Sequence, residues 1–192
     1  MKFLFLTGIS GAGRTQAAKF LEDLGYFCID NMPAPLLTKF KEFFLINETK
    51  TNKIAFVIDI RNGDFVDEFI GFVKALNDEG VIHTEVLFMD CSDEKILKRY
   101  KELKRLHPWA RDGVDNKTAI EMERKSIAPV KLISDYIIDT TEMSIWNLKN
   151  EMFQIFGADR KQSGIKTEII SFGFKNGIPA TCDIVFDVRF IP

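Results

Sequence analysis

The residues best suited to chemistry stand near the start of the chain, in the stretch Gly-Ile-Ser-Gly-Ala-Gly-Arg-Thr at positions 8–15. An apolar run at 3–6 precedes it and predicts a short buried parallel strand, and apolar residues at helical spacing follow it. A strand, a glycine turn and a helix together form a cradle for phosphate, because backbone N–H groups converge where the helix begins. We therefore expect the phosphates of a nucleotide to bind at Gly8, Ile9, Ser10, Gly11, Ala12, Gly13, Arg14 and Thr15.

The spacing of this stretch matches the phosphate-loop pattern G-x-x-x-x-G-K-S/T at every place but one, where Arg14 stands instead of lysine. A guanidinium is a wide planar fork with a different reach from an ammonium, so the exchange favours nucleotide binding over hydrolysis. Thr15 keeps the hydroxyl that would hold Mg²⁺. A side chain at any of the three glycines would obstruct an approaching anion. A glycine-rich turn that binds no ligand is the alternative interpretation.

Composition describes an ordinary globular chain of 192 residues, long enough for one core and a fragment of another. The 26 lysines and arginines nearly balance the 28 aspartates and glutamates, so charge argues neither for nor against a nucleic-acid partner. Cys28, Cys91 and Cys182 are isolated and at no metal-ligand spacing, which favours a reducing cytoplasm. We find no signal peptide and no apolar run long enough to span a bilayer, so no membrane partner is expected.

Strand and helix patterns alternate five times along the chain. Strands are expected at 3–6, 26–31, 53–59, 85–90 and 136–140. Helices are expected at 15–24, 36–46, 64–77 with Asp64 as its cap, 93–106, 115–132 with a break near Pro129, and 144–156. This alternation predicts an α/β fold of the P-loop NTPase class, a doubly wound, mainly parallel five-stranded sheet with helices on both faces. The nucleotide-binding domain is expected to span 1–157.

The pattern changes after Gly157. Residues 158–164 are polar, and two short strand patterns follow at 167–174 and 183–190. Two strands cannot bury a core of their own. We therefore expect 158–192 to be the N-terminal fragment of a second domain.

Polar residues stand at the carboxyl ends of the second, third and fourth predicted strands, the edge of a parallel sheet where ligands bind. A strand-end aspartate holds Mg²⁺ or its waters in P-loop proteins, and Asp59 and Asp90 compete for that role. After the third strand, an acid, a base and an amide are expected to bind nucleotide through Asp59, Ile60, Arg61 and Asn62, with a salt-bridged loop as the alternative. Asp30 and Asn31 fit a substrate-facing pair and a turn before proline equally well.

The most basic part of the chain follows the fourth predicted strand. Lys98, Arg105 and Arg111 are spaced to face a common partner if the segment folds over the cleft, as the basic lid of small P-loop kinases does. A solvated helix face is the alternative for each of them, because acids are interleaved. His107 is expected to be a hydrogen-bonded structural residue rather than a catalytic one.

Together these stretches resemble the RapZ/YvcJ family of bacterial nucleotide-binding proteins. The most diagnostic are Asp-Asn-Met-Pro at 30–33 and Ser-Phe-Gly-Phe-Lys at 171–175, and the others lie at 8–15, 21–29, 59–62, 99–100, 105–108, 121–124, 128–129 and 186–190. The resemblance implies a P-loop domain that binds ATP or GTP with weak hydrolysis, followed by a domain that in some members binds RNA or a small phosphorylated ligand. It implies that 8–15 is the ATP-phosphate loop and 59–62 the GTP segment. The chain departs from the family at Arg14, and it ends before the family's distal glycine- and histidine-containing motif.

Three functions follow from these observations. The first is a cytoplasmic ATP- or GTP-binding regulatory protein with slow Mg²⁺-dependent hydrolysis. In it Arg14 and the loop amides hold the phosphates, Thr15 and Asp59 organise Mg²⁺, and Arg61 or a lid arginine neutralises developing charge. The second is a small-molecule P-loop kinase, and the third an RNA-binding adaptor with a vestigial nucleotide site. Whether the protein is a homo-oligomer stays open.

Overall fold

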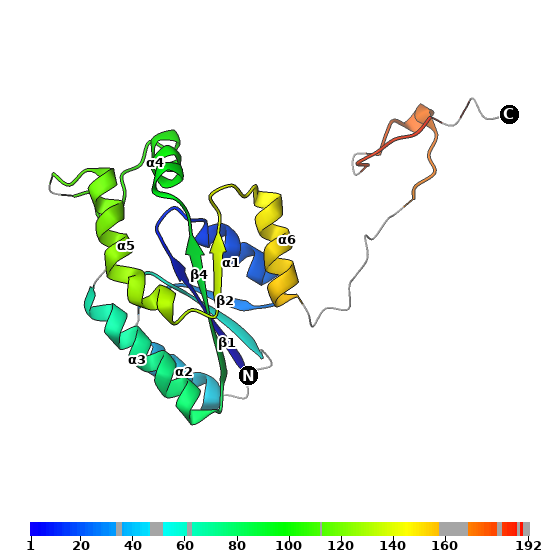
Figure 1. The fold of residues 1–192 in the computed structure, drawn as a ribbon. Coiled ribbons are helices and arrows are strands. Elements are labelled where there is room, and N and C mark those ends of the chain that lie inside the picture. The colour runs from blue at the N-terminus through cyan, green and yellow to red at the C-terminus, as the bar shows by residue number, and fades with distance from the viewer. Residues whose placement is uncertain are drawn as a thin grey trace. The chain divides into compact units, whose positions relative to one another are not determined.

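The structure, a computed structural model, describes residues 1–33, 36–46, 52–60, 63–111, 113–157, 169–179, 182–187 and 189. The chain divides into two compact units, Met1–Asp159 and Arg160–Pro192 (Figure 1). The first unit contains the sheet and the six α-helices of the described residues, and the functional site is built there.

A five-stranded parallel sheet forms the centre of the first unit. Its strands are β1 (Lys2–Gly8), β2 (Phe27–Met32), β3 (Lys53–Ile58), β4 (His83–Asp90) and β5 (Tyr136–Asp139). They are arranged in the order β2-β3-β1-β4-β5, with every neighbouring pair parallel. This confirms the predicted fold class. It also brings the carboxyl ends of all five strands to one edge of the sheet.

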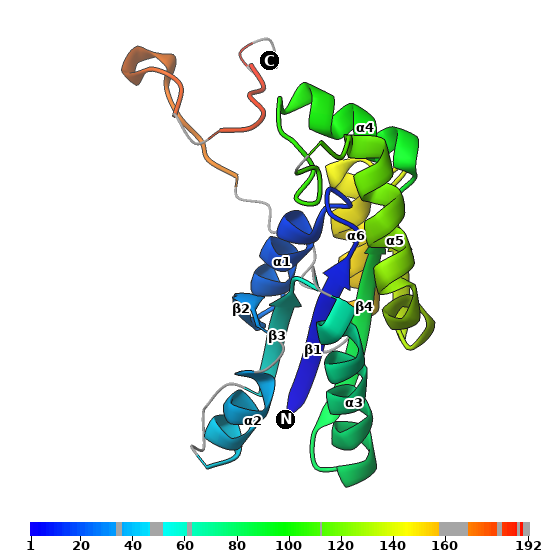
Figure 2. The ribbon, with the colours of Figure 1, turned by 90° about the vertical axis from the view of Figure 1, so that its left-hand side faces the viewer.

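Helices cover both faces of the sheet (Figures 1 and 2). They are α1 (Arg14–Asp23), α2 (Leu37–Ile46), α3 (Gly63–Glu79), α4 (Asp93–Glu102), α5 (Asn116–Leu132) and α6 (Ile145–Phe156). Helices α1 and α6 pack together over one face, and α3 and α5 pack together over the other. Helix α4 lies at the end of the unit to which the strands point (Figure 1).

Aromatic side chains fill the layer between the sheet and helix α3. Phe5 on β1 stacks on Phe56 of β3 with ring centroids 5.4 Å apart, and Phe69 of α3 meets Phe5 edge-on at 5.5 Å. All three side chains are fully buried. Each aromatic pair contributes about 0.5–1.5 kcal/mol beyond the burial of its area. This packing fixes the two strands from which the glycine loop at 8–15 and Asp59 emerge.

Gly8 allows β1 and β4 to approach each other at the carboxyl end. Its φ is +138°, and a Cβ at this position would lie 2.1 Å from the carbonyl oxygen of Met89. No side chain fits at that distance, because non-bonded heavy atoms meet at about 3.5 Å. The crowding that this glycine relieves is therefore with β4, whereas the sequence analysis expected crowding with an anion.

Three helix predictions need correction. Helix α4 ends at Glu102 rather than near Leu106, because Lys104 takes a left-handed φ of +49° and Leu106 is exposed, so no buried contact extends the helix. Helix α5 continues through Pro129 instead of breaking there, and buried residues on either side of the proline anchor both halves. Helix α3 begins at Gly63, so Asp64 lies within it rather than capping it.

The predicted strands of the second unit are wrong for the residues that the structure describes. Within 169–179 and 182–187 the regular element is a 3₁₀-helix, Phe174–Asn176 (η2), and no strand is present there. The exposed fraction of Ile169 is 91% and that of Phe186 is 79%. An alternating apolar pattern forms a strand only when a sheet partner and a core bury its apolar face.

Two further properties of the described residues concern membrane-spanning helices and cysteine thiols. They include no helix that is long and apolar enough to cross a membrane. Cys28, Cys91 and Cys182 are free thiols. Burial, together with the nearby carboxylates of Glu22 and Asp30, raises the pKa of Cys28 to about 12, so this thiol stays protonated at neutral pH.

Candidate functional site

The turn between β1 and α1 has the geometry of an anion cradle. Gly11 and Gly13 have φ values of +87° and +102°, which favour glycine. Gly13 is the N-cap of α1, makes no side-chain capping bond, and is followed by a first turn without acidic residues. The positive end of the helix dipole therefore faces the turn without a competing carboxylate from that helix. These features fit a bound phosphate.

Glu123 of α5 holds the start of this loop from outside. Its carboxylate accepts hydrogen bonds from the backbone N–H of Ser10 at 2.9 Å and from the Ser10 hydroxyl at 2.6 Å. The Nε2 of His107 lies 3.0 Å from the same carboxylate. Burial by itself would raise the pKa of Glu123, but the hydrogen bonds from His107 and Ser10 outweigh burial and hold this pKa below its usual value. The group is thus a buried, charged and fully engaged carboxylate, and His107 is structural, as the sequence analysis expected.

Two more side chains hold the middle of the loop. Arg99 of α4 donates to the carbonyl oxygen of Gly11 at 2.8 Å and to the carbonyl oxygen of Thr140 at 3.0 Å. The Thr140 hydroxyl, which follows β5, donates to the carbonyl oxygen of Ala12 at 2.8 Å. Carbonyl oxygens turned outward onto these donors leave the opposite side of the loop for its N–H groups.

Arg14 reaches from the loop to the end of β3. Its guanidinium donates to the carbonyl oxygen of Ile58 at 3.1 Å and lies 3.6 Å from a carboxylate oxygen of Asp59. It also donates to the Ser10 hydroxyl at 3.5 Å. The residue that replaces the usual lysine thus bridges two predicted parts of the site, the glycine loop and the strand-end acid.

A cleft of about 340 Å³ opens beside Arg14, and its lining joins the ends of two strands, β2 and β3, and the start of helix α1. The lining residues are Arg14, Thr15, Asp30, Asn31, Val57 and Asp59. Asn31 has a left-handed φ of +53°, and its N–H donates to the carboxylate of its neighbour Asp30 at 2.8 Å. Both residues lie within β2, where the register with β3 shifts between Ile29 and Met32, so they form an irregularity of the strand rather than the predicted turn, and they line the cleft.

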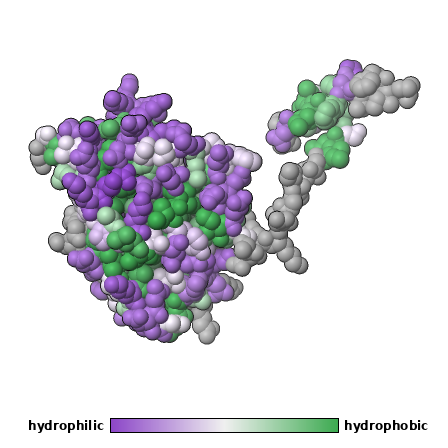
Figure 3. All heavy atoms as spheres, viewed as in Figure 1, coloured by the Kyte–Doolittle hydropathy of each residue, from purple (hydrophilic) through white to green (hydrophobic). Residues whose placement is uncertain are grey.

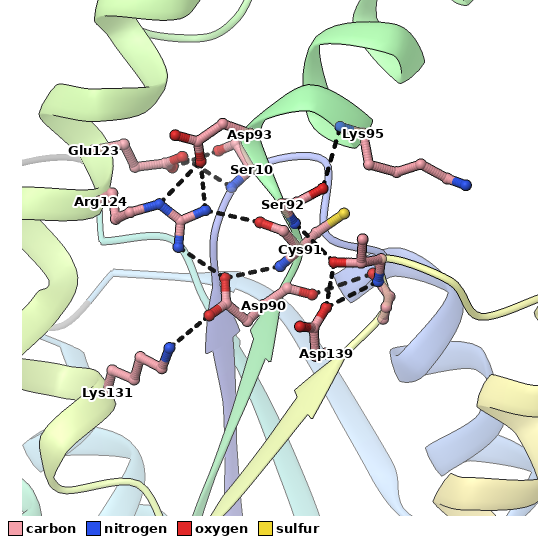
Figure 4. A network of polar contacts seen from close by, with 12 residues as sticks. Ser10, Asp90, Cys91, Ser92, Asp93, Lys95, Glu123, Arg124, Lys131 and Asp139 are labelled. Atoms are coloured by element: carbon pink, nitrogen blue, oxygen red, sulfur yellow. Dashed lines mark hydrogen bonds and ion pairs between the residues drawn. The ribbon is translucent and has the colours of Figure 1, made fainter.

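Asp90 has a different environment from Asp59 (Figure 4). Its carboxylate accepts hydrogen bonds from Arg124 at 2.9 Å, from Lys131 at 2.6 Å and from the N–H of Cys91 at 2.8 Å. Burial alone would raise the pKa of Asp90, but these donors lower it overall. Two cations from α5 thus occupy this acid, whereas Asp59 lines the open cleft.

The other predicted residues are distributed as follows. Ile9 and Ile60 are buried in the core, and Arg61 and Asn62 lie outside the described residues. The structure leaves Lys98, Arg105 and Arg111 exposed. Figure 3 shows hydrophilic residues gathered over the end of the first unit where α4 lies. Within the described ranges, no group of three or more His, Cys, Asp or Glu side chains could hold a metal ion, so Mg²⁺ would need Thr15 and phosphate oxygens as further ligands.

Sequence reasoning did not single out Arg99 and Glu123, although a signal for each exists. Arg99 lies one turn after Ile96 on α4. The side chains of Ile96 and Tyr100 lie next to Gly11, so this face of α4 is turned toward the loop. Glu123 falls between buried Ala119 and Ile127 at helical spacing, so it is a charge at a core position of α5. A charged residue on an apolar helix face needs a partner, and that requirement is the signal.

Comparison with known proteins adds the family. Residues 1–160 match the model of the RapZ-like N-terminal domain, and residues 165–192 match that of the RapZ C-terminal domain. A nucleotide-binding protein of Acetivibrio thermocellus is 46% identical over 192 residues, which is all of this chain and 65% of that protein. A nucleotide-binding protein of Heliobacterium modesticaldum is 43% identical over 194 residues and is covered to 63% of its length. The chain thus spans just under two thirds of these relatives, and the resemblance inferred from sequence is confirmed.

Solved structures show the same fold at low sequence identity. Shikimate kinase from Bacteroides thetaiotaomicron matches with a TM-score of 0.50 and 16% identity, over 82% of this chain and 97% of that one. Shikimate kinase from Acinetobacter baumannii in complex with shikimate matches with a TM-score of 0.50 and 14% identity, over 84% and 96% of the two chains. These likenesses support a P-loop kinase-like fold and nothing further about activity.

The Asp90 environment predicts how stability depends on pH. Because the pKa of Asp90 is lowered in the folded state, its contribution is present above the unfolded pKa of about 4 and is lost as pH falls through the folded pKa. Asp90→Asn should lower the free energy of unfolding at pH 7 by about 2 kcal/mol, a modest value because Arg124 and Lys131 remain partly hydrated. The difference from the parent should shrink between pH 5 and 3 in urea unfolding series. Asp67→Asn, at an exposed position of α3, is the control and should change neither quantity.

Proposed function

We propose that this chain, which belongs to the RapZ-like protein family, binds ATP or GTP at residues 8–15 as a regulatory protein and hydrolyses it slowly with Mg²⁺. The observation that carries the proposal is the joining of two features in one place. A helix N-terminus with an uncapped glycine turn opens onto the cleft that Arg14, Thr15 and Asp59 line. The relatives' shared description as nucleotide-binding proteins supports the same ligand class.

Three N–H groups of the loop already donate hydrogen bonds within the protein, which leaves the others for phosphate. The N–H groups of Ile9, Ser10 and Ala12 donate to Met89, Glu123 and Ile9 respectively. We therefore assign phosphate binding to the N–H groups of the remaining loop and first-turn residues, Gly11, Gly13, Arg14 and Thr15. A side chain at Gly11 would also press on Tyr100.

Mg²⁺ would supply charge neutralisation and orientation of the phosphates, and the acid that lines the cleft beside Thr15 is the better candidate to hold it. Asp59 lines the cleft together with the Thr15 hydroxyl, whereas Asp90 is engaged by two cations. We therefore assign the metal to Thr15 and Asp59. Arg61 remains the proposed charge-neutralising residue on sequence grounds.

Slow turnover follows from the contacts of Arg14. In the structure its guanidinium already has three partners, the Ile58 carbonyl, the Asp59 carboxylate and the Ser10 hydroxyl. A phosphate and a carboxylate would compete for this one guanidinium, and the wide fork cannot take the place of a compact ammonium between phosphates. This competition favours binding over chemistry.

A second candidate function is a small-molecule kinase, and the shape of the cleft favours it. Beyond Arg14 and Thr15 the cleft extends to Asp30 and Asn31 at the end of β2. A carboxylate and an amide beside a phosphate site could orient a hydroxyl or amine acceptor.

The other parts of the proposal concern the whole protein. We infer that 158–192 begins a larger second domain, because the RapZ C-terminal model matches at 165–192 and the relatives continue beyond the length that this chain covers. RNA binding would belong to that complete domain. A cytoplasmic location is consistent with the three free thiols, and a homo-oligomer remains open.

Thr15→Ala tests the nucleotide and metal assignment. Loss of the hydroxyl should weaken Mg²⁺-dependent binding of a non-hydrolysable ATP or GTP analogue about tenfold, because a charge-assisted contact is lost. Titration calorimetry with Mg²⁺ and with EDTA measures this, and the parent and variant should bind alike in EDTA. Thr38→Ala, at an exposed position of α2, serves as the matched control. Equal affinities of parent and Thr15→Ala in Mg²⁺ would remove the hydroxyl from the site.

Arg14→Lys tests whether the arginine limits hydrolysis. We expect phosphate release to rise about tenfold while analogue affinity changes little, since the barrier falls by about 1.4 kcal/mol when the phosphates gain a compact cation. Lys19→Arg, an exposed change on the same helix, should leave both quantities as they are. A parent that releases phosphate as fast as Arg14→Lys would show Arg14 to be a working substitute for lysine.

The kinase candidate predicts an acceptor. A mixture of small hydroxylated and amine-bearing metabolites should accelerate ADP formation from ATP and yield a phosphorylated product by mass spectrometry. Asp30→Asn should lower the accelerated rate about tenfold through the loss of a charge-assisted contact, whereas Asp23→Asn on the surface of α1 should not. If no mixture accelerates ADP formation, the kinase candidate is withdrawn.

A further inference from the structure

Glu123 is a charge in a position that an apolar residue would normally occupy. On α5 it shares the buried face with Ala119, Ile120, Ile127 and Val130, and only 2% of its surface is exposed. A carboxylate at such a position is stable only when donors surround it. The donors at Glu123 come from two segments that are far apart in sequence, the phosphate-binding loop and the connection between α4 and α5.

One oxygen atom joins these two segments. Oε2 of Glu123 lies 2.9 Å from the backbone nitrogen of Ser10 and 3.0 Å from Nε2 of His107, while Oε1 accepts from the Ser10 hydroxyl at 2.6 Å. A movement of the loop that lengthens the hydrogen bond between Ser10 and Glu123 must therefore also change the hydrogen bond between His107 and Glu123. Side-chain networks of this kind respond as a unit.

The imidazole transmits this contact to residues 103–111, which we call the basic connection. Nδ1 of His107 accepts from the N–H of Trp109 at 3.2 Å, so Nε2 carries the hydrogen and donates the bond to Glu123. The backbone N–H of His107 donates to Asn116 at the start of α5. The ring also meets Tyr100 edge-on at 5.3 Å, and Tyr100 borders Gly11 of the loop. The loop and the basic connection thus touch by two routes.

We propose that Glu123 is a positioning residue that couples the state of the phosphate-binding loop to the basic connection through Ser10 and His107. This proposal rests on the proposed function and goes beyond it. A phosphate bound in the loop would change the position of Arg105 and Arg111, which are exposed. A phosphate in the loop would draw Arg14 away from the Ser10 hydroxyl, to which Arg14 now donates at 3.5 Å, and would so change the hydrogen bond that the same hydroxyl donates to Glu123. The basic connection is then presented differently to an acidic partner with and without nucleotide.

Trp109 reports on the basic connection directly. The chain has two tryptophans, and Trp146 is 70% exposed, so Trp146→Phe leaves Trp109 as the single emitter with little disturbance. In this parent we expect saturating Mg²⁺ with a non-hydrolysable ATP or GTP analogue to shift the emission of Trp109. Glu123→Gln should remove most of the shift at saturation and weaken affinity at least about fivefold, the lower end of usual coupling between sites. Glu121→Gln, an exposed glutamate two residues earlier on α5, should behave as the parent.

A second measurement needs no nucleotide. Ser10→Ala removes the contact with Oε1 but keeps the backbone contact, so the chain should still fold. Hydrogen exchange followed by mass spectrometry should show faster exchange in 103–111, by about tenfold, which corresponds to the loss of a hydrogen bond to a charged group. Exchange in β3 should not change. Faster exchange confined to residues 8–15, or an equal rise in β3, would overturn the coupling.

The two measurements separate the failures. If the analogue binds but the emission of Trp109 does not move, or moves equally in Glu123→Gln, the coupling is wrong and the nucleotide proposal stands. If neither analogue binds, the proposed function fails, and the Ser10→Ala exchange alone decides whether loop and basic connection are coupled.

Discussion

A carboxylate buried in a protein must be paired, and at Glu123 the glycine loop at 8–15 itself provides hydrogen bonds through Ser10. Leaving such a charge without its partners costs about 3–5 kcal/mol, a large fraction of the stability of a domain of this size. The hydrogen bonds that Glu123 of α5 requires therefore fix the path of the loop. This helix lies more than a hundred residues later in the chain. Arg99 and Thr140 extend the same constraint to the next two carbonyl groups of the loop.

Helix α5 organises the carboxyl edge of the sheet by contributing charges of both signs. It directs an acid to the loop after β1, and through Arg124 and Lys131 it directs two cations to Asp90 at the end of β4. These cations neutralise the acid at the end of β4. Asp59, at the end of β3, lines the cleft beside Thr15 instead. The two strand-end acids are alike in sequence, but Asp90 pairs with two cations of α5, whereas Asp59 lies beside Arg14 of α1.

The sequence predicts the sheet, its helices and the glycine loop because each depends on local patterns, and the structure confirms them. It leaves open the choice between Asp59 and Asp90, since both follow apolar strands and only distant cations separate them. The loop contacts of Glu123 and Arg99 are not predicted for the same reason. The periodicity of a helix indicates which residues are buried but not which polar partner is buried with them. The strands expected after residue 166 fail differently. Their pattern is sound, but a strand needs neighbours, and the described residues of the second unit supply none.

Arg14 fits this frame better than a lysine would. A single ammonium presents donors from one point, whereas the guanidinium spreads over the Ile58 carbonyl, the Asp59 carboxylate and the Ser10 hydroxyl at once. The loop cation is therefore built into the resting structure, where it ties the loop to β3 while Glu123 ties it to α5. On the proposed function, a phosphate that enters the loop would draw the guanidinium from these contacts, and the contacts on both sides of the loop would change. The same proposal favours a loop that reports a bound nucleotide over one that hydrolyses it quickly.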